Sequence, residues 1–251
     1  MAIYPSLRGK AALVTGGGSG IGAQIVRRLA GQGVRVGFLD LAETPSRALV
    51  AELEARGLVA RFARCDLRDV PALRAAIAGL RDALGPADIL VNNAGHDERH
   101  RLADLTPEMF DDRVAVNLKH MVFAAQATLP DMVAKGAGVV INLGSVSWMI
   151  GQGGMPVYTA MKSAVIGLTR SIARDYGESG VRCVAVAPGW IMTERQLEKW
   201  MTPEGEAELM ARQCLKRRLT PDDVARSILF YASDEAGAIT NQHCVVDGGW
   251  T

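Results

Sequence analysis

The sequence has few cysteines, no long hydrophobic run and no surplus of either charge. Its four cysteines are far apart and form no Cys-x-x-Cys pair, which argues against structural zinc and a disulfide framework. No apolar stretch approaches the roughly 20 residues that span a bilayer. The net charge of +1 gives no basic surplus for nucleic acid or an anionic membrane. Residues 1–10 lack the apolar core of a signal peptide, so a cytoplasmic location is expected.

What the sequence does have is a regular alternation of two kinds of segment. Short β-branched runs bounded by Gly, Pro, Asn or Asp predict strands at residues 11–15, 34–39, 58–64, 89–92, 139–143, 181–186 and 244–247. Amphipathic stretches predict helices at residues 21–30, 45–56, 70–84, 107–134, 157–176 and 221–232. The alternation predicts one α/β domain over residues 1–251. We expect a Rossmann-type, doubly wound parallel sheet of about seven strands with helices on both faces.

Residues 190–219 interrupt this alternation, because they are polar and lie between the sixth strand and the last helix. A segment inserted after the carboxyl end of a strand predicts a lid over a substrate site. The alternative is a surface helical hairpin that covers the edge of the sheet.

A glycine-rich turn, TGGGSGIG at residues 15–22, follows the first strand and opens the first helix. Glycines allow positive φ angles and let the backbone approach a pyrophosphate closely. The helix N-terminus supplies free N–H groups and the positive end of a dipole. The turn therefore predicts a dinucleotide site formed by Gly16, Ser19, Gly20, Ile21 and Gly22.

Two carboxylates end the strands that follow the glycine turn. Asp40, at the end of the second strand, can accept both hydroxyls of the adenosine ribose and would repel a 2′-phosphate. No Arg or Lys lies inside the turn or directly after Asp40, so NAD is favoured over NADP. A helix-capping role for Asp40 is the alternative. Asp66 ends the third strand and could accept from adenine or cap the helix that begins near Asp69.

Together with four further motifs, these features resemble the short-chain dehydrogenase/reductase family. The motifs are NNAG at residues 92–95, Tyr158-x-x-x-Lys162, Pro188-Gly189 and DGG at residues 247–249. The resemblance covers residues 10–250 and implies a nicotinamide cofactor and a homotetramer. The further cofactor contacts that it implies are Asp66, Leu67, Asn93, Ala94, Gly95, Tyr158, Lys162, Pro188, Gly189, Ile191 and Thr193.

The resemblance also implies a catalytic tetrad of Asn117, Ser145, Tyr158 and Lys162. Oxidation of an alcohol requires removal of its hydroxyl proton, and a free phenol has a pKa of roughly 10. Lys162 lies one helical turn after Tyr158, and its charge would favour the phenolate. Ser145 would stabilise charge on the substrate oxygen, a role for which Ser147 is a rival. Asn117 would anchor a water chain leading to Lys162.

Finer features resemble a subgroup of this family, the bacterial NAD-dependent aldose (D-xylose-type) 1-dehydrogenases. The matching stretches are residues 4–7, 92–105, 145–148, 202–207 and 213–216. The subgroup implies oxidation of D-xylose, L-arabinose, D-galactose or a similar aldose at C1 to the aldonolactone. The sugar stays open because Trp190 and residues 152–155 depart from the subgroup pattern.

Polar and aromatic side chains after the fourth, fifth and sixth strands fit a small-molecule sugar, which offers hydroxyls and C–H faces. His96 and Asp97 are the polar candidates, and Trp148 and Trp190 are the stacking candidates. With the tetrad, the predicted substrate contacts are His96, Asp97, Ser145, Ser147, Trp148, Tyr158 and Trp190. Trp190 could instead pack only within the lid, and Arg99 and His100 could only fix their loop.

Three further statements complete the expectations from the sequence. No grouping of His, Cys, Asp or Glu has a metal-binding spacing, so no metal is expected. The alternative enzyme is a short-chain dehydrogenase/reductase that acts on another secondary alcohol or ketone. A non-catalytic dinucleotide-binding protein would have no need of the tetrad.

Overall fold

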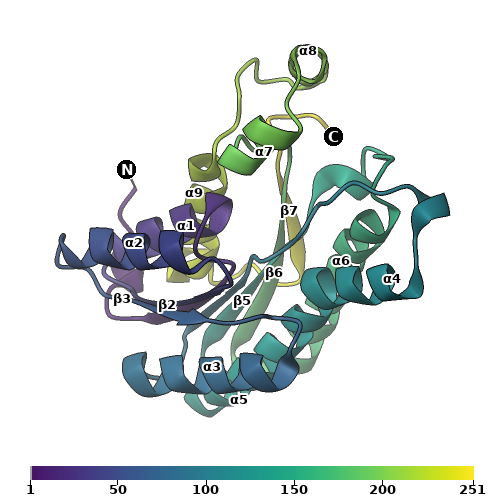
Figure 1. The fold of residues 1–251 in the computed structure, drawn as a ribbon. Helices are drawn as coiled ribbons and strands as arrows, with labels where there is room; N and C mark the ends of the chain where they lie inside the picture. Colours follow the sequence, from purple (N-terminus) through teal and green to yellow (C-terminus); the bar gives the residue numbers. More distant parts are fainter. Residues whose placement is uncertain (1) are drawn as a thin grey trace.

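The computed structural model describes residues 2–251, and its centre is one sheet of seven strands in the order β3-β2-β1-β4-β5-β6-β7. All neighbouring strands are parallel. Their bounds are Ala11–Thr15 (β1), Arg35–Asp40 (β2), Ala60–Arg64 (β3), Ile89–Asn92 (β4), Gly138–Leu143 (β5), Val181–Pro188 (β6) and Gln242–Val246 (β7). The strand order reverses direction between β1 and β4. The predicted doubly wound parallel sheet is confirmed (Figure 1).

Helices cover both faces of the sheet (Figure 1). The apolar sides of α1, α2 and α9 pack on one face, and those of α3, α5 and α6 pack on the other. The bounds are Gly20–Ala30 (α1), Glu43–Glu54 (α2), Val70–Leu84 (α3), Pro107–Val114 (α4), His120–Lys135 (α5), Pro156–Tyr176 (α6), Glu194–Lys199 (α7), Pro203–Arg212 (α8) and Pro221–Ala232 (α9).

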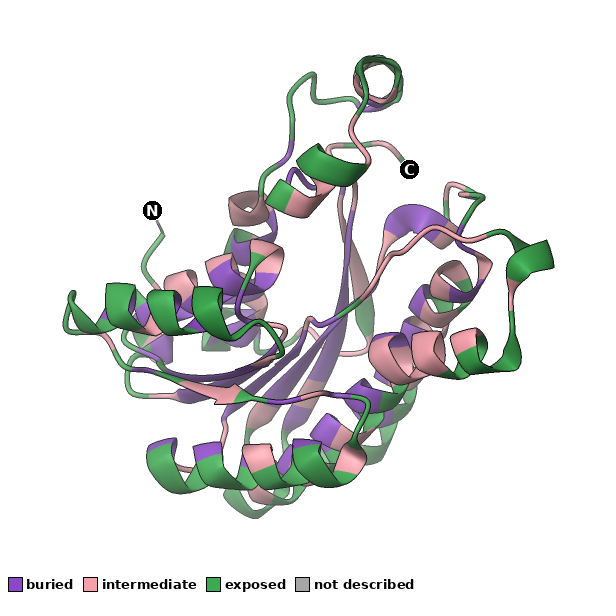
Figure 2. Ribbon diagram, in the orientation of Figure 1, coloured by how far each residue is buried: buried purple, intermediate pink, exposed green. Residues whose placement is uncertain are grey.

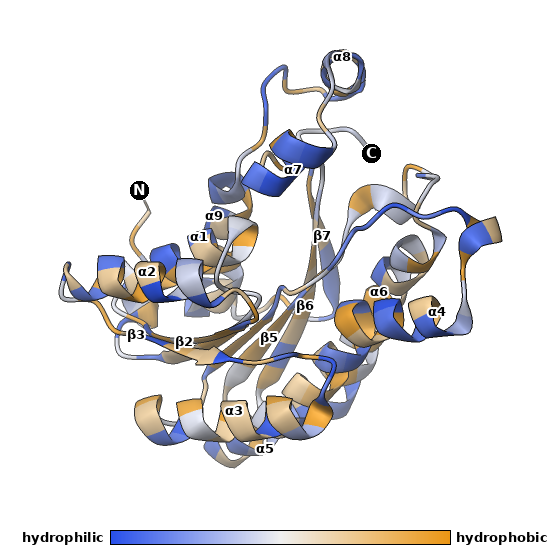
Figure 3. Ribbon diagram, in the orientation of Figure 1, coloured by the Kyte–Doolittle hydropathy of each residue, from blue (hydrophilic) through white to orange (hydrophobic). Residues whose placement is uncertain are grey.

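Burial follows directly from this layered arrangement (Figure 2). All five residues of β1 are buried, as expected for a parallel strand covered on both faces. The helices expose their outer sides (Figure 2), and the ribbon of α7 is mostly hydrophilic (Figure 3). Within residues 2–251, no helix is both long and apolar enough to cross a membrane.

Most predicted bounds agree with the structure to within two residues, and the structure adds detail to two segments. The helix predicted at residues 107–134 is divided into α4 and α5 by a π-helical turn, Ala115–Lys119. Residues 190–219 contain the short helices α7 and α8, which stand above the carboxyl ends of the strands (Figure 1). Neither feature changes the hydrophobic periodicity enough to be predicted from it.

Candidate active site

A cleft of about 1470 Å³ opens at the carboxyl ends of the strands, where the sheet order reverses. Ligand sites of small molecules usually measure roughly 300–1,000 Å³, so this cleft can hold a dinucleotide and a small substrate together. The predicted site residues that line it are Gly16, Ser19, Gly20, Ile21, Gly22, Asp40, Asp66, Leu67, Asn93, Ala94, Gly95, His96, Asp97, Ser145, Ser147, Tyr158, Lys162, Pro188, Gly189, Trp190, Ile191 and Thr193. Asn117 and Trp148 do not line it.

The glycine turn forms a cradle that side chains would fill. A Cβ atom on Gly22 would lie 1.8 Å from the carbonyl oxygen of Gly16, so this approach requires glycine. Gly16 itself has a φ of 66°, in the left-handed region. Ser19 precedes α1 but makes no capping bond with its side chain. The first N–H groups of α1 therefore have no partner within the helix, and the turn fits a pyrophosphate.

Asn93 ties the loop after β4 to the glycine turn. Its side-chain Nδ2 donates to the carbonyl oxygens of Thr15 and Gly16, both at 2.9 Å. The Thr15 hydroxyl oxygen accepts from the backbone N–H groups of Asn93 at 3.0 Å and Ala94 at 3.1 Å. These bonds join the two backbone segments that line the cleft next to the glycine turn. We call this part of the cleft the cofactor half, and the part lined by the loop after β4 and α7 the substrate half.

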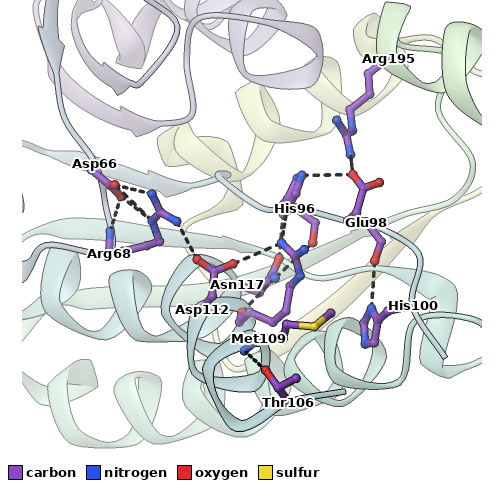
Figure 4. Close-up of polar contacts among 11 residues, drawn as sticks. Asp66, Arg68, His96, Glu98, His100, Thr106, Met109, Asp112, Asn117 and Arg195 are labelled. Carbon is purple, nitrogen blue, oxygen red and sulfur yellow. Dashed lines mark hydrogen bonds and ion pairs between the residues drawn. The ribbon is translucent and has the colours of Figure 1, made fainter. Parts of the chain in front are cut away.

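The two carboxylates that end β2 and β3 have different surroundings. Asp40 accepts from the backbone N–H of Gly18 at 2.8 Å and from that of Ala42 at 2.9 Å. Asp66 forms an ion pair with Arg68, which lowers the pKa of the Asp66 carboxyl. Arg68 continues to Asp112 (Figure 4).

The first turn of α3 has its own cap, because Asp69 accepts from the backbone N–H of Ala72 at 3.0 Å. The interpretation of Asp66 as the cap of this helix is therefore wrong. Asp66 lies three residues too early in the chain and is held by Arg68 instead.

Tyr158 and Lys162 lie one turn apart on α6, at the base of the cleft. The Lys162 Nζ donates to the carbonyl oxygen of Leu143 at 2.9 Å and lies 5.6 Å from the centroid of the Tyr158 ring. Burial raises the pKa of Tyr158 to about 12, assisted by the charge of Asp97 and opposed by a hydrogen bond with Ser145. Burial also lowers the pKa of Lys162 to about 8. The protein thus holds a neutral phenol beside an ammonium group that can lose its proton.

Asn117 lies in the π-helical turn and is completely buried. Its Oδ1 accepts from the backbone N–H of His96 at 2.9 Å, and its Nδ2 donates to the carbonyl oxygen of Arg113 at 3.0 Å. A Cβ atom on Gly95 would lie 3.2 Å from both Asn117 Oδ1 and Lys162 Nζ. Asn117 therefore holds the loop after β4 through His96 (Figure 4), and this loop passes beside Lys162 at Gly95. Single π-helical turns within α-helices are frequent at functional sites.

Ion pairs join the loop after β4 to α7. Asp97 accepts from Arg195 Nε at 3.2 Å and from Gln196 Nε2 at 2.6 Å. Glu98 accepts from Arg195 Nη2 at 2.8 Å (Figure 4). Gln196 Oε1 in turn accepts from the indole N–H of Trp190 at 2.9 Å. Sequence reasoning did not identify Arg195 and Gln196, because no local pattern signals a partner almost 100 residues away.

Trp190 and His96 line the cleft while bonded to protein groups. The ring of Trp190 also packs on α8, where a Cβ atom on Gly205 would lie 3.0 Å from it. The His96 ring contacts Arg113 and lies 3.5 Å from Glu98. α7 and α8 both contribute residues to the lining of the cleft.

Trp148 was predicted as a substrate contact, but the structure places it outside the cleft. Its indole packs on His243 of β7, with ring centroids 6.1 Å apart, and it lies outside the described lining of the cleft. Trp148 ends a 3-10 turn, Val146–Trp148, which directs it to the β7 side of the sheet. Ser147, from the same turn, does line the cleft, and its hydroxyl has no partner among residues 2–251.

No cluster of three or more His, Cys, Asp or Glu side chains in the described chain is arranged to hold a metal ion. The donors that line the cleft are backbone N–H groups, hydroxyls, amides and basic side chains. These are suited to a dinucleotide and a polyhydroxylated or carbonyl substrate.

Comparisons with known proteins place this geometry in a family. A family model described as Enoyl-(Acyl carrier protein) reductase matches residues 16–251. A relative from Caulobacter vibrioides, named "D-xylose 1-dehydrogenase", is 48% identical over 249 residues, covering 99% of this chain and 98% of the relative. A relative from Rhizobium meliloti, named "Probable galactose dehydrogenase GalD", is 43% identical over 247 residues, covering 98% and 96%.

A solved structure gives the same result at the level of the fold. The blue fluorescent protein from a metagenomic library, determined in complex with NADPH, is 35% identical with a TM-score of 0.91. The match covers 98% of this chain and 99% of that protein. The resemblance predicted from the motifs is confirmed: the chain is an oxidoreductase of the short-chain dehydrogenase/reductase family.

Proposed function

We propose that this enzyme oxidises an aldose at C1 to the aldonolactone and transfers the hydride to NAD. The observation that carries the proposal is the full-length similarity to two proteins named as dehydrogenases of xylose and galactose. The cleft supports it, because hydroxyl, amide and indole groups line the end opposite the glycine turn. Such groups suit a ligand with many hydroxyls and an apolar ring face.

Tyr158 is the proposed acid/base. Its phenolate would take the proton of the anomeric hydroxyl, while Ser145 holds that oxygen and stabilises the charge that develops on it. The charge of Lys162 would favour the phenolate against the burial that raises the pKa of Tyr158, and Lys162 would hold the nicotinamide ribose. Bound NAD supplies the hydride acceptor. Asn117 keeps the loop after β4 beside Lys162 and is the proposed anchor of a water chain through which the proton leaves.

The choice of NAD rests on Asp40. This carboxylate lines the cleft at the end of β2, where it would accept the ribose hydroxyls and repel a 2′-phosphate. Arg47, the first cation after it, is 71% exposed and bonded to Glu43. Substitution Asp40→Asn should raise kcat/KM with NADP relative to NAD by roughly 10-fold, the effect of about 1.4 kcal/mol. A wild-type preference for NADP would contradict the assignment.

We further propose a single-domain, cytoplasmic subunit that assembles as a homotetramer, with residues 190–219 as its substrate lid. The four cysteines are unpaired, as is usual in a reducing compartment. β7 ends the sheet with an open edge, and α4 and α5 expose Phe110 and Val122. Unpaired edges and exposed apolar side chains are typical of subunit contacts. Light scattering of the purified protein would measure the assembly directly.

The decisive experiment follows NADH formation at 340 nm with a panel of aldoses and simple secondary alcohols, using NAD and NADP in parallel. Turnover of one or a few aldoses with NAD is the expected result, and the product should be a lactone that hydrolyses slowly to the acid. Turnover of a secondary alcohol or ketone with no reaction of any aldose would replace the sugar proposal and leave the tetrad in place.

A further inference from the structure

Arg99 differs from the other cations that line the cleft. Each of the others has a carboxylate or carbonyl partner: Arg68 with Asp66, Arg113 with Asp112, Lys162 with the Leu143 carbonyl, Arg195 with Asp97, Lys199 with Glu98 and Arg212 with Glu208. In the part of the chain that the structure describes, Arg99 has no hydrogen bond and no ion pair. Its five N–H donors are therefore left for a ligand.

The position of Arg99 is nevertheless well defined. Its neighbour His100 donates its backbone N–H to the Gly154 carbonyl at 2.8 Å and accepts from the Val157 backbone N–H at 3.4 Å. These bonds hold the loop against the start of α6, next to Tyr158. On its other side, the guanidinium lies 5.1 Å from the ring centroid of Trp200, at the end of α7. The cation is thus stacked on the lid, with its N–H edges free.

The protein compensates this charge only in part. Arg99 is half-buried, and burial lowers the pKa of its guanidinium, while the charges of Asp97 and Tyr158 oppose this effect without outweighing it. Asp97 forms no bond with Arg99 within the described residues, because it accepts from Arg195 and Gln196. A partly desolvated donor group without a partner is unfavourable, and a bound acceptor removes that cost. A planar guanidinium held by stacking suits two neighbouring acceptor oxygens.

We propose that Arg99 binds two adjacent hydroxyl oxygens of a neutral sugar, other than the hydroxyl that reacts, and so determines which aldose is accepted. This inference rests on the proposed aldose 1-dehydrogenase function. A neutral ligand is favoured over an anionic one because seven acidic and seven basic side chains line the cleft, which leaves no positive surplus for a carboxylate. Trp200 orients the guanidinium, so the lid takes part in recognition without contacting the sugar.

The test compares Arg99→Met and Arg99→Lys with Arg47→Met, an exposed arginine on α2 outside the cleft. For Arg99→Met, KM for the preferred aldose should rise roughly 10- to 100-fold, as for loss of charged hydrogen bonds, with little change in kcat or in KM for NAD. Arg99→Lys should recover only part of the loss, because it keeps the charge but not the planar fork. Arg47→Met should match the wild type, and thermal unfolding checks that all variants fold.

Deoxy sugars identify the oxygens. Removing a hydroxyl that Arg99 binds should raise KM in the wild type and have almost no further effect in Arg99→Met. An aldose-active enzyme whose KM is the same in Arg99→Met overturns the inference and leaves the proposed function intact. Preference for a uronic acid over its parent aldose overturns the neutral ligand. If Arg99→Met lowers kcat without changing KM and shifts the alkaline limb of the pH–kcat profile, Arg99 acts on the ionisation of Tyr158 and does not bind the sugar. That result would also overturn the inference. No turnover of any aldose by the wild type overturns both proposals.

Discussion

The two halves of the cleft are built from different kinds of interaction. In the cofactor half, backbone groups of the glycine turn and the loop after β4 are bonded to each other through Thr15 and Asn93. In the substrate half, the walls meet through side chains, chiefly the ion pairs of Asp97 and Glu98 with Arg195. In the first half, the backbone segments approach so closely that only glycine fits. In the second half, the segments are held together by ion pairs between partly exposed side chains.

This difference has a consequence for specificity. Backbone geometry tolerates almost no substitution, whereas side-chain pairs can be exchanged singly without disturbing the sheet. The substrate half can therefore change its ligand while the cofactor half stays the same, as is usual where loops on a common framework carry the specificity. Most of α7, which carries Arg195 in the substrate half, is hydrophilic (Figure 3).

Tyr158→Phe, at the junction of the halves, should have the largest effect. It removes the hydroxyl that we propose transfers the proton, and kcat should fall roughly 10²- to 10⁴-fold, the usual contribution of a positioned acid/base. NADH titration by fluorescence should give an unchanged dissociation constant. Retention of more than a tenth of the wild-type kcat would show that another group transfers the proton.

Gly22→Ala tests the steric closure of the cofactor half. A Cβ atom there would lie 1.8 Å from the Gly16 carbonyl oxygen, so the turn must move. Overpacking costs about 1–3 kcal/mol, and we expect NADH affinity to fall roughly 5- to 150-fold. Gly79→Ala, in α3 with open space around the added methyl group, is the matched control. Equal affinities for the two variants would remove the distinction between the halves.

Lys162→Met should separate activity from stability. Burial lowers the pKa of Lys162 from 10.5 to about 8, so its buried charge destabilises the fold fully below pH 8, and the penalty is lost as pH rises to 10.5. At pH 7 the free energy of unfolding of the variant should exceed that of the wild type by about 1–3 kcal/mol. This figure already allows for the loss of the hydrogen bond to the Leu143 carbonyl. Urea denaturation at pH 7 and pH 10.5 measures this, and the gain should shrink at the higher pH. Its turnover should be strongly reduced. A variant less stable than the wild type at both pH values would contradict the burial argument.

Arg195→Met should have the smallest effect. Arg195 is 36% exposed, and exposed ion pairs contribute about 0–1 kcal/mol. We expect the sugar KM to rise up to roughly fivefold, with KM for NAD unchanged. Added salt should raise KM in the wild type and have less effect in the variant. Arg61→Met, which breaks the exposed pair with Glu54 away from the cleft and from residues 190–219, is the control. A larger change in KM for NAD than for the sugar would mean that the ion pairs serve the cofactor half.

The features that could be predicted from the sequence are those encoded by neighbouring residues. Strand and helix periodicity, the TGGGSGIG turn and the spacing of Tyr158 and Lys162 are local, because backbone sterics and helical repeat decide them. They were sufficient to predict the parallel sheet and most of the residues that line the cleft. The same local logic left two roles open for Asp66, and the structure excludes the cap because Asp69 occupies that position at the start of α3.

Other features exist only in the folded chain. Four of them depend on contacts between segments that are distant in the sequence. They are the π-helical turn around Asn117, the placement of Trp148 against His243, the bonds of Asp97 to α7 and the stacking of Arg99 on Trp200. Partners about 100 residues apart leave no periodic signal, and a single short turn decides whether an indole faces the cleft or the sheet edge. The sequence by itself therefore determined the fold and the family, and it predicted the reacting groups. The tertiary structure decided which side chains are left free to meet the substrate, because that depends on long-range pairing of charges.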